Sequence, residues 1–156
     1  MVKKDILSSS ISFPFGINFM IRSVAKELNC SLDQARSYIY LYKDKHMEDS
    51  MIQKIEPIIS KLKSSWLTKF QEALGNLSNG ISIPSTIFVT VDQELAEFFS
   101  EVIKNEEFNQ YSLTESKFRV IILGTQTLHG TVVFKENVMR DPFIIIESIY
   151  INRFLR

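Results

Sequence analysis

The chain has 156 residues, 45% of them apolar, which is long enough to bury the core of one domain. Its 18 basic and 18 acidic residues cancel, which excludes the strong positive field typical of proteins that bind nucleic acid or anionic membranes. Cys30 is the one cysteine, so an intrachain disulfide and a cysteine-based zinc site are excluded as well. The start lacks an apolar signal core, and no run approaches the ~20 apolar residues of a membrane span, so we expect a cytoplasmic protein.

The N-terminal part of the chain predicts one strand and two helices. Ile6–Phe13 is expected to be a strand that ends in a Pro-x-Gly turn. Apolar residues then recur at helical spacing over Gly16–Asn29, which predicts a helix. A second helix is expected over Ser31–Lys45, where Ser31 and Gln34 have the spacing of a capping box.

A long amphipathic helix is the most regular pattern in the sequence. Its apolar stripe is Ile52, Ile55, Ile58, Ile59, Leu62, Trp66, Phe70, Leu74 and Leu77. Pro57 predicts a kink or a helix boundary, and Gly75-Asn76 with Asn79-Gly80 predicts the end of the helix. Trp66 is expected in the core, the alternative being an anchor at a protein interface.

The C-terminal half alternates between predicted strands and predicted helices. Thr86–Val91 is expected to be a buried strand, and Asp92 is expected to cap the helix that follows it. Phe118–Leu123 predicts another strand, and Thr127–Phe134 a strand paired with it or at an edge. Phe143–Leu155 is expected to be the last helix.

Two further features complete the predicted architecture. Asp141-Pro142 has the composition of a helix start, and the polar stretch Asn105–Ser116 is expected to be a loop. The alternation predicts the α/β fold class, with helices packed on a small mixed sheet in a single domain over residues 1–156. The strands expected to share that sheet are Ile6–Phe13, Ile87–Val91 and Phe118–Leu123.

Few side chains in this sequence have the spacing of a catalytic or metal site. His46 and His129 are the two histidines and stand far apart, whereas a zinc site needs three or four converging ligands. Glu94 and Glu97 could supply paired carboxylates, but their helix is expected to place them on its solvated side. We therefore expect no catalytic residue and no metal site.

A short motif runs from the first strand into the first helix. Its residues are Gly16, Ile17, Asn18, Met20, Ile21, Val24 and Ala25. It resembles the Gly-Gly-Asn-x-Ile-Thr-x-x-Ile-Ala pattern in the C-terminal half of actin-like ATPases of the bacterial cell-division and type IV pilus assembly (FtsA/PilM) type. The family continues with a Ser-x-x-x-Ala helix, similar to Ser31 and Ala35, a long helical region, and a strand similar to Pro84–Val89. The resemblance covers residues 6 to 104.

The resemblance implies one lobe of the actin-like (ribonuclease H-like) fold, belonging to a larger protein. It assigns Gly16, Asn18 and Asp92 to a degenerate nucleotide site. The family's second glycine is Ile17 here, and Val91-Asp92-Gln93-Glu94 replaces its late Gly-Gly turn. An acidic turn repels phosphate, and its side chains block the close backbone approach that glycine permits. The family's Asp-x-Gly phosphate loops precede the first strand, so no cofactor is expected, and ATP only in a completed protein.

The function implied is a non-catalytic scaffold or protein-interaction module in pilus assembly or cell division. Its expected partners are proteins, with a homo-oligomer as one option and no nucleic acid. Its expected place is the cytoplasm, including the inner face of the membrane, which it would reach through a partner. Two alternatives stay open: a nucleotide-binding lobe of an ATPase that needs its missing N-terminal half, and an unrelated soluble α/β interaction domain.

Overall fold

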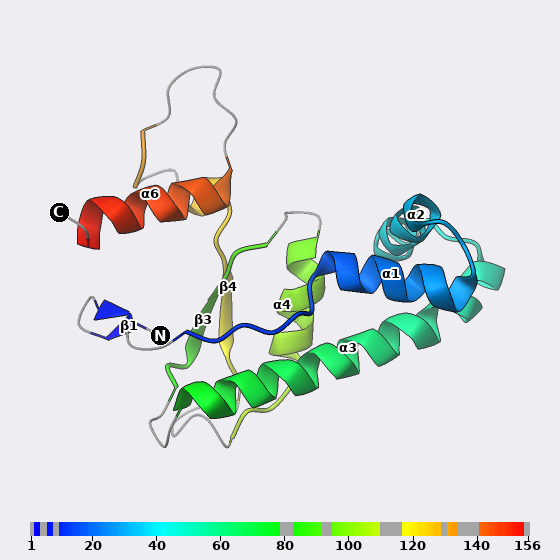
Figure 1. Ribbon diagram of the computed structural model, residues 1–156, viewed down its shortest axis with the longest axis horizontal. Helices are drawn as coiled ribbons and strands as arrows, with labels where there is room; N and C mark the ends of the chain where they lie inside the picture. The colour runs from blue at the N-terminus through cyan, green and yellow to red at the C-terminus, as the bar shows by residue number, and fades with distance from the viewer. Residues whose placement is uncertain are drawn as a thin grey trace. The chain divides into compact units, whose positions relative to one another are not determined.

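The computed structural model describes residues 2–3, 6–7, 10–78, 83–91, 95–109, 117–128, 131–133 and 141–154 (Figure 1). Its elements are β1 (Val2–Lys3), β2 (Ile6–Leu7), α1 (Ile17–Leu28), α2 (Leu32–Lys43), α3 (Asp49–Ser78), β3 (Thr86–Val89), α4 (Ala96–Lys104), β4 (Arg119–Ile122), α5 (Thr125–Leu128) and α6 (Pro142–Phe154). The chain divides into two compact units. We call residues 11–76 the helical unit, and residues 1–10 with 77–156 the sheet unit.

The helical unit begins with the two predicted helices α1 and α2. The buried side chains of α1 are Met20, Ile21, Val24 and Ala25, and those of α2 are Ala35 and Ile39. Asn29 ends α1 in the left-handed conformation, at φ 51° and ψ 49°, which asparagine tolerates better than most residues. The predicted capping box is confirmed: Gln34 N–H donates to Ser31 Oγ (3.2 Å), and Ser31 N–H donates to Gln34 Oε1 (3.0 Å).

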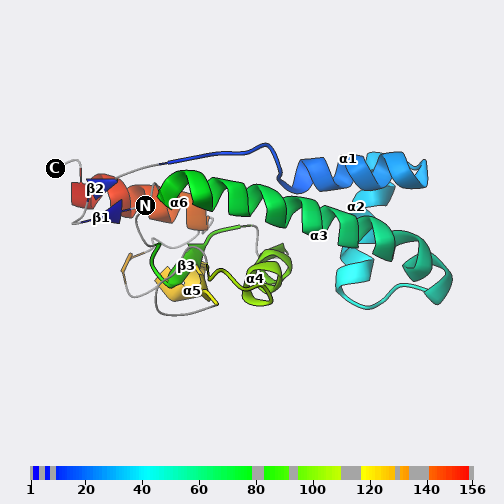
Figure 2. The same ribbon diagram turned by 90° about the horizontal axis from the view of Figure 1, so that it is seen from below.

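The long helix α3 lies beside α1 in both views (Figures 1 and 2). Its predicted stripe is buried at Ile55, Ile59, Leu62 and Trp66. Of the kink or boundary expected at Pro57, the boundary is wrong, because α3 continues through this residue. A proline inside a helix costs about 3 kcal/mol, and the burial of Ile55 and Ile59 on either side offsets that cost.

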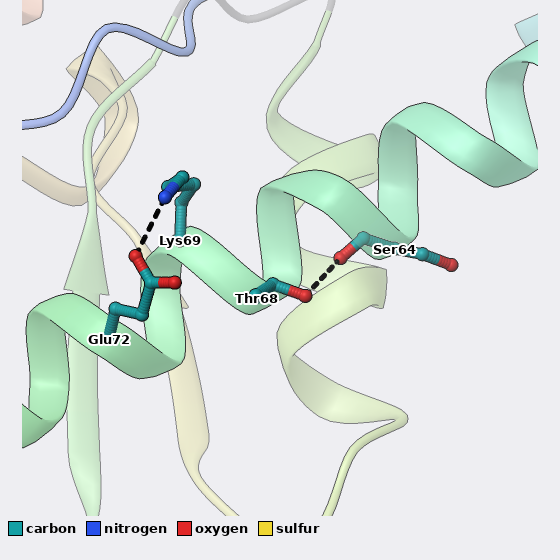
Figure 3. A network of polar contacts seen from close by, with 4 residues as sticks. All are labelled: Ser64, Thr68, Lys69 and Glu72. Carbon is teal, nitrogen blue, oxygen red and sulfur yellow. Dashed lines mark hydrogen bonds and ion pairs between the residues drawn. The ribbon is translucent and has the colours of Figure 1, made fainter.

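Exposed polar side chains of α3 make local contacts with one another (Figure 3). Lys69 Nζ donates to Glu72 Oε2 at 2.8 Å, and Thr68 Oγ1 donates to the Ser64 carbonyl at 3.0 Å. An exposed ion pair of this spacing contributes about 0.3–0.5 kcal/mol. The stability of α3 therefore comes from its apolar stripe.

The sheet unit contains two separate pairs of strands in place of the predicted single mixed sheet. β1 and β2 are antiparallel, whereas β3 and β4 are parallel, with Thr86 opposite Arg119 and Val89 opposite Ile122. The expected strand Ile6–Phe13 is present at Ile6–Leu7, which pairs with β1, and is wrong at residues 10–13, which form no strand.

The aromatic side chains that follow β2 in the sequence explain this difference. Phe13 packs edge-on against Trp66 of α3, with ring centroids 6.3 Å apart. Phe15 packs on Phe19 of α1 at 4.4 Å. These contacts hold the segment against the helices of its own unit, so it forms no ladder with β3 or β4.

The β3–α4–β4 part of the sheet unit confirms the predicted order of elements. The buried residues of α4 and its start are Leu95, Ala96, Phe99, Ser100, Val102 and Ile103. Phe118, just before β4, is buried and packs on Phe108 with ring centroids 4.8 Å apart; Phe108 is fully buried within the predicted loop. The expectation that β3 is buried is wrong, because Phe88 is 60% exposed.

The C-terminal part contains one wrong element and one confirmed helix. The strand expected at Thr127–Phe134 is wrong where it is described, since α5 occupies Thr125–Leu128. Leu128 N–H bonds the Gly124 carbonyl, and Leu128 is buried, so the chain turns directly after β4. Helix α6 is confirmed with its cap: Asp141 Oδ1 accepts from the N–H groups of Phe143 (2.8 Å) and Ile144 (3.4 Å). Among the described residues, no helix has the length and apolarity needed to cross a membrane.

Candidate functional site

Gly16 and Asn18, the first two residues assigned to a degenerate nucleotide site, lie together at the start of α1. Gly16 is the N-cap, with φ −110°, a conformation open to any residue. A Cβ added at Gly16 meets no atom within 4 Å, so no close backbone approach requires glycine there. Asn18 is exposed in the first turn. The third residue, Asp92, lies outside the described residues.

Neither of the two histidines belongs to helix α1. His46 is exposed beyond the end of α2, and His129 lies outside the described residues. Within the described part of the chain, no three histidine, cysteine, aspartate or glutamate side chains are placed to hold a metal ion. Burial raises the pKa of Tyr42 on α2 above 10.0, and the Glu56 carboxylate raises it further. A phenol that stays protonated near neutral pH is structural here.

Helices α1 and α2 are joined by a three-residue turn, residues 29–31, as in helix–turn–helix proteins that bind DNA. Affinity for DNA comes largely from cations that contact phosphates. The exposed charges of α2 near its start are Asp33 and Arg36, which cancel. The start of α2, the part that such proteins place in the DNA groove, therefore lacks the cluster of cations typical of a nucleic-acid site.

Helix α6 carries an exposed apolar surface that is suited to binding a partner. Four of its large apolar side chains are exposed: Phe143 (46%), Ile144 (59%), Tyr150 (41%) and Ile151 (55%). At 3.6 residues per turn, these positions fall within about one third of the helix circumference. We call this set the α6 apolar face. Burying it against another protein would release ordered water from apolar surface, which is the main driving force of association.

Glu147 gives the α6 apolar face a charge. Helical spacing places it between Phe143 and Ile151, and it is exposed. Among the described residues it makes no ion pair within 4.0 Å. A partner that covers the face would need a cation opposite Glu147, because burying an unpaired carboxylate is costly.

A hollow of about 410 Å³ lies beside α6, on a different side of the helix from the α6 apolar face. It is lined by Thr131, Val132, Val133, Ser148, Ile149 and Asn152. Its polar groups already have partners: Ser148 Oγ donates to the Ile144 carbonyl, and Asn152 Nδ2 to the Ser148 carbonyl. None of the described residues that line the hollow is charged, so none of them is placed there to act as a general acid or base.

Comparison with protein-family models, with curated proteins and with solved structures found no match.

The sequence reasoning missed the α6 apolar face, although the signal was present. The pattern of Phe143–Leu155 predicts a helix. Its two apolar runs, Ile144-Ile145-Ile146 and Ile149-Tyr150-Ile151, place apolar residues on nearly every side of that helix. A helix that is apolar all round is normally buried on all sides. Among the described side chains of α6, Ile145 alone is buried, whereas Phe143, Ile144, Tyr150 and Ile151 are exposed.

Proposed function

We propose that this chain is a non-catalytic, actin-like scaffold module that binds a protein partner in pilus assembly or cell division. The observation that carries the proposal is the α6 apolar face. The proposed partner presents an apolar patch with a lysine or arginine placed opposite Glu147. The actin-like part of the proposal rests on the motif from Gly16 to Ala25 and on the order of the elements that follow it.

Its exposure and its charge make the α6 apolar face better suited to binding a protein than to binding a small molecule. Small-molecule sites are concave and enclose most of the ligand, whereas these four side chains project from one helix. An amphipathic or apolar helix lying against them would bury alternate turns of both helices. The central Glu147 would then fix the register and exclude partners without a matching cation.

Photo-crosslinking from α6 in the native cell tests this function. A photoreactive phenylalanine analogue replaces Ile151, and the same analogue at Ser60, exposed on α3, is the control. We expect an adduct with a pilus-assembly or cell-division protein from position 151 and none from position 60. Glu147→Lys should abolish the adduct by placing like charges together.

Three results would count against the proposal. One is the absence of any adduct at position 151 in a folded protein. Another is an adduct that survives Glu147→Lys unchanged, which would remove the role of charge. The third is an adduct with a protein from an unrelated process, which would leave the face a docking site and refute the assignment to pilus assembly or cell division.

A further inference from the structure

Among the described residues, the parallel β3–β4 pair leaves one edge of β3 without a partner strand. Ser85 carbonyl accepts from Arg119 N–H (2.7 Å), and Val89 carbonyl accepts from Leu123 N–H (2.8 Å). Residues of β3 with odd numbers therefore direct their backbone groups toward β4. Because successive residues of a strand alternate, Thr86, Phe88 and Thr90 direct theirs the opposite way. No described residue pairs with that side of β3.

This edge lacks the features that normally prevent strands from pairing with other chains. Edge strands of natural proteins are commonly interrupted by lysine, proline or a bulge. Between Ser85 and Val91 the sequence has no charged residue and no proline. Phe88 lies in the middle of the strand with 60% of its surface exposed. The edge of β3 and the exposed Phe88 side chain together form a surface on which a further strand can pair.

The same edge is complementary to itself. If two copies align β3 antiparallel about a two-fold axis through Phe88, then Phe88 lies opposite Phe88, and Thr86 lies opposite Thr90. Each of these would be a hydrogen-bonded pair, with Cα atoms about 5.5 Å apart. The two Phe88 rings would become cross-strand neighbours, an arrangement that stabilises paired strands. No charge on the strand opposes this register.

We propose that a second copy of this chain pairs with the open edge of β3, giving a four-stranded sheet β4–β3–β3–β4 across a two-fold axis. The occupant is a second copy because a two-fold axis through Phe88 pairs uncharged residues only and places the exposed Phe88 ring beside its own counterpart. A pairing limited to one short strand buries little surface, so the dimer is weak and forms at high concentration. The inference is independent of the α6 apolar face.

Analytical ultracentrifugation over a wide range of protein concentration is the main test. We expect the wild-type chain to pass from monomer to dimer as its concentration rises. Phe88→Pro removes an outward N–H while leaving every N–H that faces β4, and edge positions tolerate proline. It should weaken self-association at least about tenfold, equivalent to 1.4 kcal/mol. Phe88→Lys keeps the N–H but adds charge and should act in the same direction.

Val133→Lys is the matched control, because Val133 is 98% exposed in the same unit and is not on the strand. This variant should dimerise like the wild type. Hydrogen exchange gives a second readout that does not depend on the variants: the amides of Thr86, Phe88 and Thr90 should gain protection as concentration rises. A chain that stays monomeric with these three amides unprotected would overturn the inference. So would a dimer that both Phe88 variants leave unchanged.

Discussion

Replacing Trp66 by alanine tests how the helical unit is held together. The indole is 8% exposed, lies edge-on to Phe13, and stacks on Phe70 with centroids 5.0 Å apart and planes 12° from parallel. Truncating a buried tryptophan costs about 3–5 kcal/mol, which is a large share of a typical domain's 5–15 kcal/mol. Each aromatic pair adds about 0.5–1.5 kcal/mol beyond burial. Because two pairs are lost, we expect a value near the upper end, about 4–5 kcal/mol.

Urea unfolding followed by far-ultraviolet circular dichroism measures this loss. Fluorescence is unsuitable because the chain has one tryptophan, which the substitution removes. Trp66→Phe keeps a ring against Phe70 and should cost less than Trp66→Ala. Ser65→Ala, at the exposed neighbouring position, should change stability by no more than about 0.5 kcal/mol. A loss below about 1 kcal/mol for Trp66→Ala would refute the role of this residue as the packing centre.

Three further predictions concern caps and titration. Ser31→Ala should destabilise the chain by about 1 kcal/mol in urea unfolding because the capping box is lost, whereas Ser37→Ala on the exposed side of α2 should have almost no effect. Asp141→Ala should lower the helical circular dichroism signal and cost about 1 kcal/mol, since two N–H groups lose their acceptor. The raised pKa of Tyr42, due to burial and then to Glu56, contributes stability that is complete below pH 10.0 and is lost as the pH rises through the folded-state pKa. Tyr42→Phe should therefore reduce the fall in urea midpoint above pH 10.0; an equal fall in both proteins would contradict that pKa shift.

The helices could be predicted from the sequence because burial and periodicity act together in them. The stripe through Ile55, Ile59 and Trp66 repeats at three and four residues, a spacing that no strand can use. Ser31 with Gln34 fixed the start of α2 by a local hydrogen-bond pattern that depends on no distant contact. Local signals of this kind predict structure well because they do not depend on which tertiary contacts form.

The strands were harder to predict because an alternation of apolar residues also occurs in segments that form no strand. Ile11 and Phe13 alternate as in a strand, but the same alternation suits an extended segment lying on a helix, and Phe13 packs on Trp66. Residues from Thr127 onward are rich in β-branched side chains, yet burial of Leu128 after Gly124 turns the chain into α5. Which surface a short apolar run covers is decided by distant residues, and the run itself does not encode that choice.

The candidate site could be predicted only in part. Gly16 and Asn18 were expected at the start of the first helix, and the structure places them there. The exposure of Phe143 and Ile151 was not expected, because an apolar helix is usually covered by its own chain. Composition shows that a helix is apolar, whereas exposure depends on how much other surface the fold supplies to cover it.

Calorimetric titration of the intact chain with Mg-ATP tests the central claim, a module without nucleotide chemistry, most directly. We predict no heat of binding, because the proposed resemblance puts the acidic Val91-Asp92-Gln93-Glu94 stretch in place of a glycine turn. The surroundings of Gly16 also do not require the close approach that glycine allows. Gly16→Val should then leave the titration unchanged. Micromolar binding of Mg-ATP that Gly16→Val abolishes would contradict the proposal and establish a nucleotide-binding lobe.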